Sequence, residues 1–139
     1  MKTTDCFNRG LLHRVPIEQE RVRSALSLAA HYLERAEGNL KIKYADVTFL
    51  MAYTSMLQSA SAFLFFEGVK ERSHVCAVQY VREKLGSDEA FGPFVELLDT
   101  YRQNRHETQY DGAAVSLEDA RQIVADANSF LALVKKRVS

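Results

Sequence analysis

Two arginines, a histidine and a tyrosine lie close together between positions 102 and 110. Arg102 and His106 are four residues apart, so on a helix they would share one face. Arginine offers a planar set of donors for phosphate, and histidine can transfer protons near neutral pH. Such side chains suit metal-independent cleavage of RNA, in which the ribose 2′-hydroxyl is the nucleophile. The same spacing also fits cations that only stabilise the dipole at a helix end.

Arg105 stands where the helical pattern calls for an apolar residue. It is the next member of a stripe with three–four spacing, formed by Phe94, Leu97, Leu98 and Tyr101. Because a buried unpaired charge is costly, Arg105 must meet a partner, water or an anion. We therefore take Arg102, Arg105 and His106 as candidate catalytic residues. The candidate ligand-binding residues are Arg105, His106, Tyr110 and Asp111.

The elements that must position these residues are predicted to be helices. Apolar periodicity, caps and stop signals predict five of them, over residues 17–38, 44–67, 73–85, 88–106 and 116–137. The second is apolar nearly all round and should be the central rod of a bundle. No stretch shows the alternation of a strand. The prediction is an all-α fold, an up-and-down bundle of four to five helices, with one domain over residues 1–139 and an N-terminal extension over residues 1–16.

Composition excludes several classes of protein. The 139 residues contain 18 basic and 18 acidic side chains, so no global charge attracts nucleic acid or membrane. A near-neutral chain is compatible with an oligomer. Cys6 and Cys76 are 70 positions apart, so neither a metal site nor a disulfide framework is expected. Without a secretory leader or a long uncharged apolar run, we expect a cytoplasmic protein with no membrane span.

The remaining polar features have simpler explanations. The corner at residues 67–74 reads as a capped turn with exposed charges. His13 and His31 are isolated, so no metal is expected. Tyr53 and its aromatic neighbours are expected in the core or at a dimer surface. The sequence contains no phosphate-binding loop, dinucleotide fingerprint or serine-hydrolase arrangement, so no cofactor is predicted.

Three segments together resemble the HEPN superfamily (higher eukaryotes and prokaryotes nucleotide-binding). The helix over residues 44–68 is similar to the family's central helix of small and aromatic residues. The sequence Arg72-Ser73-His74 resembles the polar turn that follows it. The segment at residues 105–112 resembles the arginine, polar residue, tyrosine and glycine segment of bacterial and archaeal members. The resemblance covers roughly residues 17–138.

The resemblance implies a bundle of four to five helices and a homodimer whose two motifs face one cleft. Many members are toxins paired with a minimal nucleotidyltransferase. Active ones are metal-independent ribonucleases with an Arg-x4–6-His motif. Here four residues separate Arg105 from Tyr110, so a tyrosine stands at a position where the motif has its histidine. His106 directly follows Arg105. A tyrosine, with an ordinary pKa of about 10, is a poor base at neutral pH.

Three hypotheses remain open at this point. The first is a HEPN-like protein that binds a nucleotide, RNA or a nucleotidyltransferase partner, as part of a toxin–antitoxin-type module, with weak or no catalysis. The second is a ribonuclease toxin that uses Arg102 or Arg105 with His106. The third is a structural homodimeric module in which the arginines pair with Asp99, Glu107 or Asp111 across the interface.

Overall fold

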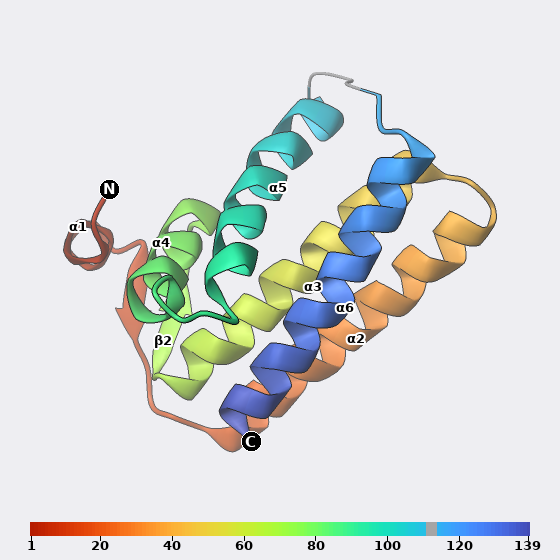
Figure 1. Cartoon of the computed structure of the whole chain (residues 1–139). Coiled ribbons are helices and arrows are strands. Elements are labelled where there is room, and N and C mark those ends of the chain that lie inside the picture. The colour runs from red at the N-terminus through yellow and green to blue at the C-terminus, as the bar shows by residue number, and fades with distance from the viewer. Residues whose placement is uncertain (111–113) are drawn as a thin grey trace.

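The computed structural model describes residues 1–110 and 114–139, with residues 109 and 110 described for their backbone alone. In this part of the chain six helices surround one core, and two short strands pair at one end (Figure 1). The elements are α1 (Thr3–Asn8), β1 (Leu12–Arg14), α2 (Gln19–Lys41), α3 (Ala45–Phe66), β2 (Val69–Glu71), α4 (His74–Leu85), α5 (Gly92–Tyr110) and α6 (Leu117–Val138). The predicted all-α helical bundle is confirmed.

Helix α3 is the central rod, as its apolar sequence predicts. It packs against α2 and α6 on one side and against α4 and α5 on the other. Small residues allow a close approach to α2, where the Ser55 hydroxyl donates to the Ala29 carbonyl at 2.7 Å. Its length and hydropathy would also suit a membrane span, but 67% of its most apolar window is buried inside the bundle. Those features therefore follow from its place in the core.

Helix α5 packs on α3 and α4 and is joined to α6 by side chains. The Tyr101 hydroxyl donates to the Asp126 carboxylate, which is buried on α6. Nearer the start of α5, the rings of Phe94 and Phe130 stack with their centroids 6.2 Å apart. The N-cap predicted for α6 is confirmed, because the Ser116 hydroxyl accepts the Asp119 N–H at 3.0 Å.

Several predictions about the elements were wrong. Helix α5 runs from Gly92 to Tyr110 rather than over residues 88–106. Helix α2 does not end at Gly38 but continues to Lys41, and the chain turns at Lys43, which has a φ of 64°. The strands were missed because each has only three residues, too few for a visible alternation. They pair antiparallel, with Leu12 opposite Glu71. Gly68, with a φ of 76°, forms the turn between α3 and β2, as predicted for a helix stop.

The N-terminal segment is covalently joined to the bundle, contrary to the expectation for its cysteine. Cys6 of α1 forms a disulfide with Cys76 of α4, with 5.9 Å between their Cα atoms. Both residues are fully buried, so Cys76 is a core residue as well as half of a crosslink. Spacing along the sequence suggested no pairing, because a separation of 70 positions hides a proximity that only folding creates.

Candidate functional site

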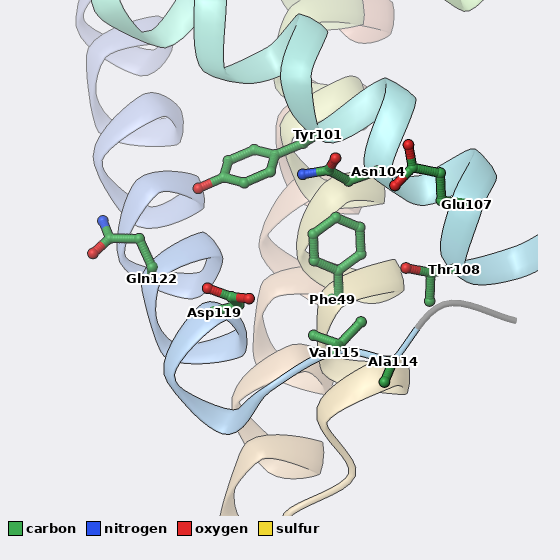
Figure 2. A pocket seen from close by; sticks show the side chains of 9 residues that line it. All are labelled: Phe49, Tyr101, Asn104, Glu107, Thr108, Ala114, Val115, Asp119 and Gln122. Carbon is green, nitrogen blue, oxygen red and sulfur yellow. The ribbon is translucent and has the colours of Figure 1, made fainter.

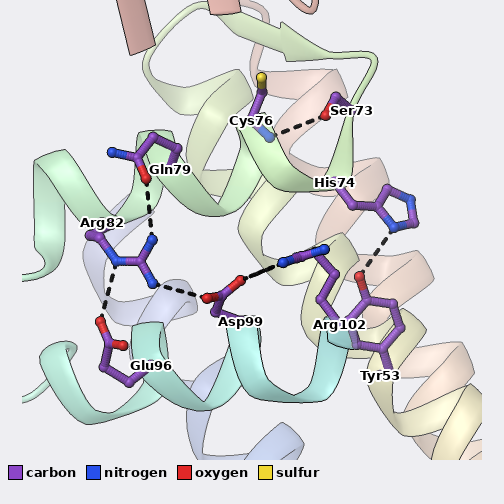
Figure 3. A network of polar contacts seen from close by, with 9 residues as sticks. All are labelled: Tyr53, Ser73, His74, Cys76, Gln79, Arg82, Glu96, Asp99 and Arg102. Atoms are coloured by element: carbon purple, nitrogen blue, oxygen red, sulfur yellow. Dashed lines mark hydrogen bonds and ion pairs between the residues drawn. The ribbon is translucent and has the colours of Figure 1, made fainter. Parts of the chain in front are cut away.

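Five polar side chains gather where α5 crosses α3 and the first turn of α4. Arg102 and Asp99 come from α5, Tyr53 from the middle of α3, and His74 from the start of α4 (Figure 3). The fifth, Arg105, also comes from α5 and lies near Tyr53. We call this group the arginine cluster. Three-residue spacing brings the α5 members to one side of that helix. The Ser73 hydroxyl, which accepts the Cys76 N–H at 3.2 Å, caps α4 and fixes the position of His74.

Tyr53 and His74 form a hydrogen-bonded pair. The Tyr53 oxygen lies 3.1 Å from Nδ1 of His74. Burial raises the pKa of Tyr53 to about 12, although Arg105 and Arg102 oppose the rise, so the phenol keeps its proton at neutral pH. The phenol is thus able to donate to Nδ1, and in that tautomer a neutral His74 carries its proton on Nε2.

The surroundings of His74 favour that neutral form. Burial lowers the pKa of His74, and the positive charges of Arg105 and then Arg102 lower it further. The position at the N-terminus of α4 acts in the same direction, because the helix dipole disfavours a cation there. In the tautomer that accepts from Tyr53 at Nδ1, His74 offers a hydrogen-bond donor at Nε2.

The predicted tension at Arg105 is resolved by an aromatic ring. Its guanidinium carbon lies 6.0 Å from the centroid of the Tyr53 ring, at the outer limit of a cation–π contact. The side chain is half-buried, consistent with its place on the apolar stripe of α5. The ring therefore lies beside the guanidinium group, which keeps its positive charge.

Arg102 is held by an ion-pair chain that runs along α4 and α5. Its Nη2 lies 3.0 Å from Oδ1 of Asp99, and Oδ2 of the same carboxylate lies 3.3 Å from Nη2 of Arg82. Arg82 in turn contacts Glu96 at 3.2 Å (Figure 3). The chain fixes Arg102 beside the Tyr53–His74 pair. Asp99 therefore pairs with arginines of its own subunit, whereas the hypothesis of a structural homodimeric module places this pairing between subunits.

Comparison with known proteins places this helical bundle in a family. The model of the HEPN domain matches residues 22–137, most of the chain. The chain belongs to the HEPN family. No curated protein matches it. The match begins in α2 and ends in α6, so it includes α3, α4 and α5, which build the arginine cluster.

The structure brings together two of the site residues predicted from the sequence. Arg102 and Arg105 come together in the arginine cluster, and His106 is exposed one turn beyond Arg102. Tyr110 is the last residue of α5, but its side chain and the whole of Asp111 lie outside the described residues. Sequence reasoning assigned His74 to an exposed polar turn, and the family's turn segment was the only signal that pointed to it.

A second feature of this HEPN protein lies on the opposite flank of α5. A cavity of about 300 Å³ opens between α3, α5 and α6, and we call it the acidic pocket (Figure 2). Its lining is Phe49, Tyr101, Asn104, Glu107, Thr108, Ala114, Val115, Asp119 and Gln122. These described lining residues include two carboxylates and no basic side chain.

The side chains of the two features differ in what they can bind. The arginine cluster presents guanidinium and imidazole donors, which suit phosphate oxygens. The described residues contain no group of three or more His, Cys, Asp or Glu side chains placed to hold a metal ion. The chemistry available at the arginine cluster is thus anion binding by fixed donors.

Proposed function

We propose that this HEPN protein binds the phosphate of a nucleotide or an RNA in the arginine cluster, and that it cleaves RNA weakly or not at all. The observation that carries the proposal is the hydrogen bond between Tyr53 and Nδ1 of His74, beside two arginines. A general base needs a free acceptor nitrogen, and with Tyr53 as donor to Nδ1 the acceptor nitrogen of neutral His74 is occupied. Nε2–H of His74 and the positive charges of Arg102 and Arg105 then favour an oxyanion.

The test of binding is a titration of a fluorescent single-stranded RNA in EDTA, followed by anisotropy, with Arg105→Ala and Arg121→Ala side by side. Arg121 is an exposed residue of α6 and supplies the matched loss of one positive charge. We expect Arg105→Ala to weaken binding about 10- to 100-fold, as loss of charge-assisted hydrogen bonds predicts. Equal affinities for the two variants would refute binding at the cluster.

A ribonuclease that uses His106 is the second candidate, favoured by the exposure of His106 one turn beyond Arg102. The test is RNA cleavage in EDTA by the wild type, His106→Ala and His74→Ala. Cleavage that only His106→Ala abolishes would support this candidate over a binding protein. A wild type that binds RNA without cutting it would support the first proposal.

Partners and location extend the proposal. We propose a homodimer in which two arginine clusters face one cleft, as the family resemblance implies, and a toxin–antitoxin-type module with a minimal nucleotidyltransferase. Sedimentation tests the dimer, and co-expression with a nucleotidyltransferase encoded beside the gene tests the module.

We also propose a cytoplasmic location. Because disulfides are rare there, the redox state of Cys6 and Cys76 in cells is the decisive measurement.

A further inference from the structure

We propose that the acidic pocket binds an organic cation with a guanidinium or amine group. The pocket is separate from the arginine cluster, so this inference goes beyond the binding of phosphate or RNA. A volume of about 300 Å³ lies at the small end of the range for ligand sites and suits a single side-chain-sized group. Three features of its lining select a cation: two carboxylates, an aromatic floor, and the end of a helix.

The carboxylates of Glu107 and Asp119 stand on opposite sides of the pocket, with the ring of Phe49 between them (Figure 2). Both side chains belong to exposed residues. Neither has an ion-pair partner among the residues that the structure describes. A cation placed between them would be attracted from both sides, whereas an anion would be repelled.

The floor of the acidic pocket is aromatic. Phe49 and Tyr101 meet edge to face, with ring centroids 5.8 Å apart and an interplanar angle of 81°. Aromatic faces attract guanidinium and ammonium groups, especially where water is partly excluded. The Tyr101 hydroxyl points to Asp126, which also accepts the Gln122 amide at 3.1 Å. Asp126 therefore adds a third carboxylate behind the floor.

The position of Glu107 has no structural explanation in the helix that carries it. Glu107 lies near the C-terminal end of α5, where backbone carbonyls already create a negative potential. An acidic residue at that end is unfavourable for the helix. Asp119, by contrast, lies in the first turn of α6 and is stabilised by the dipole. The unfavourable placement of Glu107 across from Asp119 is the kind of local conflict that function explains.

The ligand is organic rather than a metal ion. A divalent ion needs several ligands converging within bonding distance, and the described residues offer no such group. The adjoining cavity shares Thr108, Ala114 and Val115 with the acidic pocket and contains Lys43 and Asp46, whose charges offset each other. Glu107 and Asp119 are therefore the charged side chains in the described lining of the acidic pocket.

The experiment uses two cationic probes, because a guanidinium can come from a free amine or from an arginine of another protein. The probes are agmatine and the peptide acetyl-Gly-Arg-Gly-amide, and the citrulline peptide is the neutral control of equal shape. Binding is followed by backbone amide shifts in NMR spectra of the full chain. We expect saturable shifts around the pocket with at least one cationic probe and none with citrulline. Agmatine alone would identify a free amine, and tighter peptide binding would identify a protein partner.

Three variants make the test specific. The double variant Glu107→Gln, Asp119→Asn keeps the shape of the pocket and the backbone cap at Ser116, and should weaken binding about 10-fold or more. Glu118→Gln, on the neighbouring exposed residue outside the lining, should leave it unchanged. Arg105→Ala should also leave it unchanged, so failure of phosphate binding and failure of this proposal are separable. No saturable shift with either cationic probe, or equal binding of citrulline, would overturn the inference.

Discussion

The two flanks of α5 have opposite charge although they are built on the same pair of helices. On one flank Arg102 and Arg105 face α4, and on the other Glu107 faces α6. Each flank rests on an aromatic residue of α3: Tyr53 lies under Arg105, and Phe49, one turn earlier, forms the floor of the acidic pocket. Residues two positions apart, such as Arg105 and Glu107, point to different sides of a helix. One helix can therefore separate two binding preferences.

The outer helices α4 and α6 supply different hydrogen-bond partners to the tyrosines of the two flanks. On the basic flank, α4 brings His74, which is kept neutral by burial and by the arginines. On the acidic flank, α6 brings Asp126, which accepts hydrogen bonds from Tyr101 and Gln122. Both flanks thus hold a tyrosine that acts as a donor, but the acceptor is an imidazole in one and a carboxylate in the other. This difference can be measured.

Loss of the Cys6–Cys76 disulfide should have the largest effect and should act on the basic flank. We expect Cys6→Ala, Cys76→Ala to lower the free energy of unfolding by about 2–4 kcal/mol, because the crosslink closes a long loop. Urea unfolding with and without reductant measures it, and reduced wild type should resemble the variant. Because Cys76 lies two residues after His74, RNA binding should weaken while agmatine binding persists. Identical unfolding of oxidised and reduced protein would contradict the prediction.

Removing one hydroxyl from each flank compares the two tyrosine bonds directly. Tyr101→Phe leaves the buried Asp126 with only the Gln122 amide, and should cost about 1–3 kcal/mol of folding free energy. Tyr53→Phe makes the same chemical change against a half-buried neutral imidazole, and should cost about 0.5–1.5 kcal/mol. Urea unfolding of both variants gives the comparison. A larger cost for Tyr53→Phe would reverse the assignment of the stronger bond.

The helices of the fold could be predicted from the sequence because their causes are local. The apolar surface of α3 and the Ser116 cap of α6 are visible in short windows. The β1–β2 pair could not be predicted, since Leu12 and Glu71 meet only after α2 and α3 have folded back on each other. The disulfide could not be predicted for the same reason. The end of α2 was misplaced because Gly38 is tolerated on an open helix surface.

The residues of the candidate site also divide into those that a local sequence pattern indicates and those that only the fold brings together. Arg105 was identified because it interrupts an apolar stripe within one helix, and the structure gives it an aromatic support. His74 and Tyr53 are 21 positions apart on different helices, so no local pattern joins them to the arginines. The acidic pocket was missed because its carboxylates come from α5 and α6 and each, taken alone, looks like a solvated charge.

The titration of His74 gives the smallest effect and the most direct view of the basic flank. Since the pKa of His74 is lowered in the folded protein, the unfolded chain binds a proton more readily below about pH 6.5. Stability should consequently fall as the pH drops from 6.5 toward the folded pKa. Removing a nearby charge with Arg105→Ala should raise the pKa of His74 and flatten this dependence. NMR titration of the imidazole, with urea unfolding at each pH, measures both the pKa and the stability.

Inorganic phosphate bound at the arginine cluster should also raise the pKa of His74, because an anion stabilises imidazolium. A His74 pKa that neither Arg105→Ala nor phosphate changes would separate the imidazole electrostatically from the arginines.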